Sequence, residues 1–403
     1  MKKIFLLITV ILAVNMINAL KVHGESPESP TIHSEAAILL EANSGQILFE
    51  KNANELMYPA SVTKIATAIF AIENGNLEDI VTVSSNASAR NVEGTTVFLE
   101  EGEQVTLKKL IQGLVINSGN DAGIAIAEHL SGSVEQFSDD LNLYLTNVIG
   151  TEQTNFENPH GLFDEEHVTT AEDMAKITQH AMKNDEFMII FGTKEMEWDG
   201  KTWDTTLRTH HKLVKDEIPY DGITGGKNGF VSLSGYTLVT TAEKDDLNLV
   251  AVTLKSSYDE EAYKDTVELL DYGFENFSTS SIEKGSVFTV DEQEYEAPKK
   301  MSYTHSTDDK IRETVDESGT LKIVSQNDTI ASFQLEEINK ESVEVETQLA
   351  SDQTETSLLG KLFSVLPYII IIFGVGMIVV FFTTIRKKSR KKYVVRNNKR
   401  YYF

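Results

Sequence analysis

The chain has 403 residues, enough for two domains of ordinary size, and its 41% hydrophobic and 24% charged residues fit a folded globular protein rather than a disordered one. Its 62 Asp and Glu residues outweigh 36 Lys and Arg residues, so the formal net charge is −26 and no nucleic-acid partner is expected. The absence of Cys excludes disulfide scaffolds, thiol catalysis and Cys-ligated metals.

The first residues have the pattern of a secretory signal peptide. Two lysines precede the apolar run Ile4–Val14, and this run of eleven residues is too short to span a hydrocarbon core of about 30 Å. Small residues at Ala19 and Gly24 offer cleavage sites. We therefore expect a signal peptide over residues 1–24, with an uncleaved N-terminal anchor as the alternative.

The body that follows is expected to combine strands at its ends with helices between them. Ala36–Leu40 and Gln46–Glu50 flank an Asn-Ser-Gly turn and predict a β-hairpin. Helical composition or periodicity is found in three further segments, which are Ile65–Ile72, Leu107–Ile116 and Ala122–Leu130.

A second hairpin is predicted late in the body, where Tyr236–Thr241 and Asn248–Leu254 flank the polar turn Glu243–Asp246. Strands at both ends of a helix-rich middle indicate an α+β body. We expect the strands from its two ends to share one sheet.

The composition changes after about residue 277. Short strand-like runs separated by polar turns predict a small β-rich domain over 277–340, and a polar spacer is predicted over 341–361. The strand-like runs lie at residues 286–290, 321–324 and 330–335.

The end of the chain has the pattern of a membrane anchor. Leu362–Phe382 has 21 residues without a charge, about the number needed to span a bilayer. Nine Lys and Arg residues and no acid follow between Arg386 and Phe403, which predicts that the tail, residues 383–403, is cytoplasmic. The chain is therefore expected to be a single-pass protein of the cell membrane, with its main body on the extracytoplasmic side.

A candidate nucleophile and base occur together near the first predicted helix. Ser61 and Lys64 form a Ser-x-x-Lys motif, so they lie on one helical face and the amine can reach the hydroxyl. Burial would lower the pKa of the lysine and allow it to act as a base. The motif alone is weak, because Ser281–Lys284 and Ser389–Lys392 repeat it.

Two more motifs accompany this pair in a fixed order. Ser118–Asn120 lies in a break between two predicted helices, and Lys227–Gly229 lies on an apparent strand before the second hairpin. Motifs of the types Ser-x-x-Lys, Ser-Asp-Asn and Lys-Thr-Gly form the signature of penicillin-binding proteins and class A β-lactamases.

Four segments, Pro59–Lys64, Asn117–Ala122, Asn158–Leu162 and Gly225–Phe230, together resemble the low-molecular-mass penicillin-binding proteins. More narrowly, they resemble the serine-type D-alanyl-D-alanine carboxypeptidases of the S11 peptidase type, over roughly residues 32–275. The resemblance implies an α+β, β-lactamase/transpeptidase-like catalytic domain, with an antiparallel sheet and a helical subdomain. It also implies that the protein trims D-Ala-D-Ala stem peptides of peptidoglycan, is inhibited covalently by β-lactams, and needs no cofactor or metal.

Carried over by position, the resemblance implies a role for each motif residue. Ser61 would be the acylated nucleophile and Lys64 its general base. Ser118 would pass the proton to the leaving D-alanine, and Asn120 would orient Lys64 and the substrate amide. Lys227 would supply positive potential for the terminal carboxylate of the substrate.

The remaining substrate-binding residues implied by the resemblance are Asn228, Gly229 and Phe230. Backbone N–H groups of Ser61 and Phe230 would form the oxyanion hole. Asn228 departs from the family, which usually has Thr or Ser at this position, with a hydroxyl that bonds the substrate carboxylate. An Asn amide can still donate but reaches further, so the departure bears on binding strength and substrate choice.

Two other functions stay open from the sequence. A β-lactamase needs a carboxylate that positions a deacylating water, and Glu165 or Glu166 could supply it. A non-catalytic wall-binding protein would have lost turnover through Asn228. Zinc hydrolysis is disfavoured, because the nine His residues form no His-x-x-x-His pair near an acid.

Overall fold

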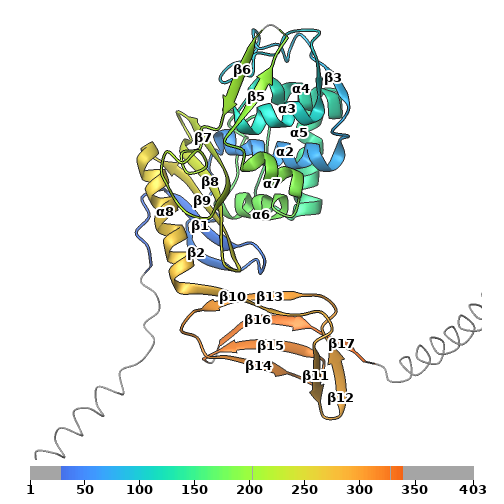
Figure 1. Cartoon of the computed structure of the whole chain (residues 1–403), viewed down its shortest axis with the longest axis vertical. Helices are drawn as coiled ribbons and strands as arrows, with labels where there is room; N and C mark the ends of the chain where they lie inside the picture. The colour runs from blue at the N-terminus through green and yellow to red at the C-terminus, as the bar shows by residue number, and fades with distance from the viewer. Residues whose placement is uncertain (1–28, 202, 327, 339–403) are drawn as a thin grey trace, which may run out of the picture. The chain divides into compact units, whose positions relative to one another are not determined.

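The computed structural model describes residues 29–201, 203–326 and 328–338 of the chain (Figure 1). The predicted signal peptide, spacer, membrane span and tail lie outside these residues. Among the helices within them, none has the length and apolar character needed to cross a membrane. The described residues divide into two compact units: the larger runs to Asp291 and resumes over Glu296–Glu336, and the smaller holds Glu292–Tyr295 together with Glu337 and Ile338.

An antiparallel sheet of five strands organises the larger unit, in the order β2-β1-β9-β8-β7. The strands from the two ends of the body pair directly, since Ala36 lies opposite Leu254, so the predicted α+β fold with shared terminal strands is confirmed. The five strands are β1 (Ala36–Glu41), β2 (Ile47–Lys51), β7 (Ile223–Val231), β8 (Gly235–Lys244) and β9 (Leu247–Ser256).

Both predicted hairpins are present, but the second turns more tightly than expected. The sequence predicts the four-residue turn Glu243–Asp246, whereas β8 continues to Lys244 and β9 already begins at Leu247. The connection is short because Asp245 adopts a left-handed backbone conformation with φ 52°, which Asp tolerates better than most residues.

Both faces of the sheet are covered, which explains why β1 is buried along its whole length. Ile38 and Leu40 belong to a core shared with the helices, whereas Ala37 and Leu39 pack with α8 (Asp259–Asn276). Successive side chains of a strand point to opposite faces, so a continuous apolar run here is a strand with two buried sides. Figure 1 shows α8 on one side of these strands and α2, α6 and α7 on the other.

The helices between β2 and β7 carry most of the first core. The three predicted helical segments correspond to α2, α3 and α4. Helix α3 covers the predicted range and is capped by Thr106, whose side chain accepts a hydrogen bond from Lys109 N. The elements are η1 (Ala60–Val62), α2 (Thr63–Asn74), α3 (Leu107–Ile116), α4 (Asn120–Ser131), α5 (Val134–Tyr144), η2 (Leu145–Ile149), α6 (Ala171–Ala181) and α7 (Asp185–Phe191). Two small two-stranded antiparallel sheets accompany them, made by β3 (Ile80–Thr82) with β4 (Gln104–Thr106) and by β5 (Glu195–Asp199) with β6 (Asp204–Arg208).

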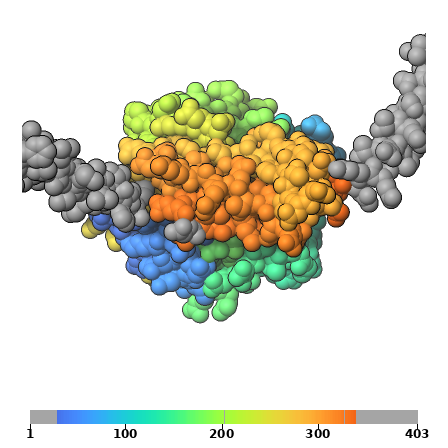
Figure 2. Space-filling model, turned by 90° about the horizontal axis from the view of Figure 1, so that it is seen from below, coloured from blue at the N-terminus to red at the C-terminus, as the bar shows by residue number. Residues whose placement is uncertain are grey.

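After α8 the described residues form strands and turns, whose surface is drawn in orange in Figure 2. The three predicted strand-like runs correspond to β11, β15 and β16, and β10 starts at Phe277, where the second domain is predicted to begin. The domain limits themselves stay predictions. The strands are β10 (Phe277–Ile282), β11 (Val287–Val290), β12 (Gln293–Glu296), β13 (Met301–Ser306), β14 (Ile311–Val315), β15 (Thr320–Ser325), β16 (Asp328–Gln334) and β17 (Glu336–Glu337).

Candidate active site

Ser61 and Lys64 lie in contact at the start of the first long helix. Ser61 belongs to the short 3-10 helix η1, and Lys64 follows in the first turn of α2. Lys64 Nζ donates a hydrogen bond to Ser61 Oγ at 3.0 Å and another to the backbone oxygen of His160 at 2.6 Å. The structure thus brings the predicted nucleophile and base together.

The environment of Lys64 favours a neutral amine. The side chain is fully buried, and this burial lowers its pKa well below the ordinary value; the nearby ammonium of Lys227 lowers it further, while Asp121 opposes the change. An amine that loses its proton easily can accept the proton of the Ser61 hydroxyl. The pair therefore has both the geometry and the electrostatics of a nucleophile with its base.

The loop Asn158–Leu162 supports this pair through its backbone. The His160 carbonyl accepts from Lys64, and Thr67 Oγ1 donates to the Pro159 carbonyl at 2.7 Å. Gly161 has φ 85°, and a Cβ there would lie only 1.8 Å from the Ala60 oxygen, so only Gly fits. Sequence reasoning missed the His160 carbonyl as a partner of the base, and the Pro-His-Gly run was the available signal.

Two imidazoles beside Lys64 are kept neutral. Burial lowers the pKa of His160 and of His167 to about 3 each. His167 Nδ1 accepts from the backbone N–H of Glu157, so its other nitrogen carries the proton and donates to Thr63 Oγ1 at 2.9 Å. His160 Nδ1 likewise accepts from the backbone N–H of Leu162 at 3.2 Å, so hydrogen bonds hold both neutral rings in place.

Ser118 and Asn120 line the break between α3 and α4. Both are nearly buried, and Ser118 adopts the left-handed conformation with φ 61°, an uncommon strain for a non-glycine residue. Asn120 Nδ2 donates to the backbone oxygen of Glu93 at 2.7 Å. Lys64 Nζ donates to Ser61 and His160, so the implied role of Asn120 in orienting Lys64 stays a prediction.

The third motif lies on β7, at the edge of the five-stranded sheet. Lys227 is 3% exposed, donates to the Asn228 backbone oxygen at 2.8 Å, and has its pKa lowered to about 7 by burial. A Cβ on Gly229 would lie 2.6 Å from both Ser61 N and Thr237 Oγ1, so β7 and η1 lie too close together for any side chain at position 229. This approach brings the two segments with the predicted oxyanion donors, Ser61 and Phe230, side by side.

The remaining side chains of the third motif are more open. Asn228 is half-buried, and Phe230 is 54% exposed with its ring 4.6 Å from that of Tyr236. Glu165 and Glu166, the two carboxylates considered for a β-lactamase, are exposed in a turn. Neither is therefore held in a buried position of the kind that orients a catalytic water.

Two other features do not enlarge the site. Within the described ranges, no group of His, Asp and Glu side chains could hold a metal ion. A polar pocket of about 770 Å³ is lined by residues of β10 and β13, among others, and contains none of the predicted site residues. The chemistry supported here is acyl transfer, with a hydroxyl nucleophile, an amine base and a second ammonium for an anionic substrate group.

Comparison with known proteins agrees with this chemistry. The family model described as D-alanyl-D-alanine carboxypeptidase, Peptidase S11, matches residues 23–257. D-alanyl-D-alanine carboxypeptidase DacF of Bacillus subtilis (strain 168) is 32% identical over 271 residues, which cover 66% of this chain and 68% of that protein. DacA of Haemophilus influenzae is 29% identical, and the match covers 79% of this chain and 80% of the relative.

Solved structures show the same similarity. Penicillin binding protein 5 from Haemophilus influenzae has a TM-score of 0.70 and 28% identity, and the match covers 77% of this chain and 98% of that one. A variant of the Streptomyces K15 DD-transpeptidase has a TM-score of 0.58 and 27% identity, with 61% of this chain and 100% of that one covered.

Proposed function

The chain belongs to the peptidase S11 family of D-alanyl-D-alanine carboxypeptidases, and we propose that it removes the terminal D-alanine of peptidoglycan stem peptides through an acyl-enzyme on Ser61. The observation that carries the assignment to Ser61 is the 3.0 Å hydrogen bond from the fully buried Lys64 amine to its hydroxyl. Neither the β-lactamase nor the wall-binding alternative is favoured by the relatives.

The first half of the reaction forms an ester. Ser61 Oγ attacks the carbonyl carbon of the penultimate D-alanine while its proton moves to the neutral amine of Lys64. The new O–C bond forms, the C–N bond to the terminal D-alanine breaks, and Ser118 relays the proton from Lys64 to the leaving nitrogen. Backbone N–H groups of Ser61 and Phe230 hold the oxyanion; removing one such donor typically costs about 10²–10³ in rate.

The second half returns the free enzyme. A water gives a proton to Lys64 and attacks the ester carbon, so the ester C–O bond breaks and Ser61 recovers its hydroxyl proton. Lys227 and Asn228 hold the terminal carboxylate of the peptide during acylation. The positive charge of Lys227 is central to this contact, and a bound carboxylate would in turn favour the charged ammonium.

The direct test is labelling with a fluorescent penicillin, together with a D-alanine release assay on a D-Ala-D-Ala peptide. We expect the wild-type protein to form a long-lived adduct and Ser61→Ala to form none while remaining folded by circular dichroism. Ser281→Ala, which alters the repeated motif on β10, is the matched control and should label normally. Adduct on the Ser61→Ala protein, or rapid loss of the wild-type adduct, would contradict the proposal.

We also propose that the protein is secreted and anchored at its C-terminus, which rests on the sequence alone. The charged start with a short apolar run is typical of a signal peptide, and the uncharged run Leu362–Phe382 with its basic flank is typical of a single-pass anchor. The body would then face the peptidoglycan, with the tail in the cytoplasm.

Protease added outside intact cells tests this topology. It should degrade the body and leave a tag placed after Arg386 protected. A body that is protected unless the cells are lysed would overturn the proposed orientation.

A further inference from the structure

Asp121 is a buried carboxylate that the reaction scheme does not use. It lies in the first turn of α4, has no exposed surface, and accepts three backbone hydrogen bonds, from Val97, Leu99 and Ala122, at 2.9–3.1 Å. Burial raises the pKa of this carboxyl, whereas the three N–H donors oppose that rise and suit its ionised form, which only accepts. Two of the donors come from a loop more than twenty residues away in sequence.

This loop, the 93–99 segment, is joined to the Ser118–Asn120 turn at several points. Asn120 donates from its side chain to the Glu93 oxygen and from its backbone to the Thr95 oxygen, both at 2.7 Å. Asn117 Nδ2 donates to the Thr96 oxygen at 3.0 Å. Asn117 and Asn120, on either side of Ser118, therefore bind carbonyl groups of the 93–99 segment, while Asp121 binds N–H groups of the same segment.

The segment bends around the Asp121 carboxylate. The two N–H groups of this segment that Asp121 binds, those of Val97 and Leu99, flank Phe98, which takes φ 62°, a strained left-handed conformation for a bulky residue. The carboxylate also leaves little room for a side chain on the turn, because a Cβ on Gly119 would lie 3.0 Å from Asp121 Oδ1. One side chain thus binds the loop and lies close to the catalytic turn.

We propose that Asp121 is a positioning residue for acyl transfer, which holds the 93–99 segment against the first turn of α4 and so fixes the positions of Asn120 and Ser118. The inference rests on the proposed function, since it assigns Asp121 to the reaction of Ser61. Removing the carboxylate leaves the backbone N–H groups of Val97 and Leu99 without this partner. The loop then no longer fixes the orientation of the Asn120 side-chain amide.

The charge of Asp121 gives the proposal a readout beyond stability. Of the groups that face Lys64, Lys227 on β7 lowers the pKa of Lys64 and Asp121 on α4 raises it. The three imidazoles around Lys64, those of His160, His167 and His210, have lowered pKa values, mainly through burial, and are neutral near pH 7. Loss of the Asp121 charge therefore lowers the pKa of Lys64 further and moves the acidic limb of the acylation rate to lower pH.

The test measures the acylation rate of the full chain by a fluorescent penicillin across pH, for wild type, Asp121→Asn and Asp121→Glu. We expect both variants to acylate about 10–100-fold more slowly at the plateau, in line with misplacements of about 1 Å. The acidic limb should move to lower pH in Asp121→Asn only, because Glu keeps the charge.

Asp173 provides the matched control. It is 2% exposed, lies in the first turn of α6, and likewise binds the backbone N–H groups of a distant loop, those of Glu152 and Gln153. Asp173→Asn should lower the thermal midpoint as much as Asp121→Asn does, yet leave the plateau rate and the acidic limb near those of wild type.

The outcomes separate this proposal from the proposed function. A wild-type protein that forms no adduct contradicts the proposed function, whatever the variants do. An active wild type with Asp121→Asn matching Asp173→Asn in rate and pH profile overturns the positioning role. If Asp121→Asn does not fold, Asp121→Glu decides: slow acylation with an unmoved acidic limb supports the role, and a wild-type rate overturns it.

Discussion

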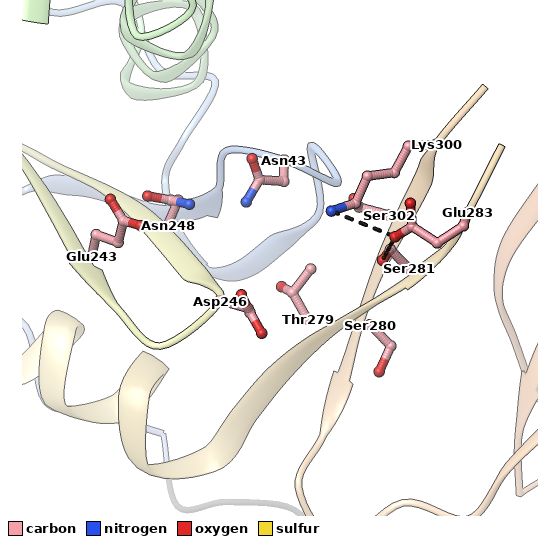
Figure 3. A pocket seen from close by; sticks show the side chains of 10 residues that line it. All are labelled: Asn43, Glu243, Asp246, Asn248, Thr279, Ser280, Ser281, Glu283, Lys300 and Ser302. Atoms are coloured by element: carbon pink, nitrogen blue, oxygen red, sulfur yellow. Dashed lines mark hydrogen bonds and ion pairs between the residues drawn. The ribbon is translucent and has the colours of Figure 1, made fainter.

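The same four-residue motif occurs at two described places in this chain, and only one of them has the structure of an active site. At Ser61–Lys64 the lysine is fully buried and donates to the serine hydroxyl. At Ser281–Lys284 both residues are exposed, and Ser281 Oγ donates to Glu283 instead, at 3.0 Å. Figure 3 shows Ser281 in the polar pocket by β10, where Glu283 also pairs with Lys300 at 3.7 Å.

The difference comes from the backbone on which the motif lies. Residues three apart on a helix have Cβ atoms about 5–6 Å apart, whereas an extended strand advances about 10 Å over three residues. Ser281 lies near the end of strand β10 and Lys284 beyond it, so the spacing that joins Ser61 to Lys64 separates these two. A Ser-x-x-Lys motif therefore indicates chemistry only where a buried helix start is predicted as well.

The largest expected difference between the two Ser-x-x-Lys motifs follows from removing the lysine of each. Lys64→Ala should slow both penicillin labelling and D-alanine release by about 10²–10⁴-fold, the usual contribution of a general base. Lys284→Ala should change neither rate. Equal effects of the two substitutions, measured by stopped-flow acylation, would mean that burial and helical geometry do not distinguish the two motifs.

The next largest effect concerns β7, the strand that approaches the backbone of Ser61 at Gly229. Gly229→Ala would place a methyl group 2.6 Å from Ser61 N, so β7 must move away from η1. We expect acylation to fall by about 100-fold, since displacements of about 1 Å have this effect, and the thermal midpoint to fall as well. A folded variant that acylates at the wild-type rate would show that β7 does not help to form the oxyanion site.

Much of the fold could be predicted where one residue pattern decides the outcome. The period of Leu107–Ile116 and the hairpins at the two ends are local signals, and their elements form as expected. The carbonyl of His160 and the carboxylate of Asp121 could not be assigned in this way. Both act through backbone groups of distant segments, and no spacing in the sequence shows which segments will meet.

A smaller effect is expected at Asn228, the departure from the family pattern. Asn228→Thr should raise kcat/KM on a D-Ala-D-Ala peptide by about tenfold, or about 1.4 kcal/mol, because a hydroxyl closer to the strand aligns the carboxylate better. Acylation by a β-lactam should change less. Equal or lower peptide turnover in a D-alanine release assay would mean that the site is adapted to Asn228 and to another peptide end.

The smallest expected effect is a pH dependence that distinguishes the two buried lysines. Lys227 must be protonated to hold a carboxylate, and its pKa is lowered to about 7, so KM should rise several-fold as the pH increases above 7. Lys64 must be neutral, so kcat should rise or stay constant over the same increase in pH. In Lys227→Arg the guanidinium stays charged, and the rise in KM should disappear. A rise that persists in the Arg variant would assign it to another group.

The pairing of β1 with β9 has a consequence for how the enzyme is made. Ala36 at one end of the body lies beside Leu254 at the other, and the strand that carries Lys227 joins the sheet only through β8 and β9. Contacts between such distant parts of a chain form slowly, because a long loop must close before they contribute. During synthesis, Ser61 leaves the ribosome long before β9 exists. The nascent chain therefore cannot assemble its β7-dependent site, and activity appears only when nearly the whole body has been made.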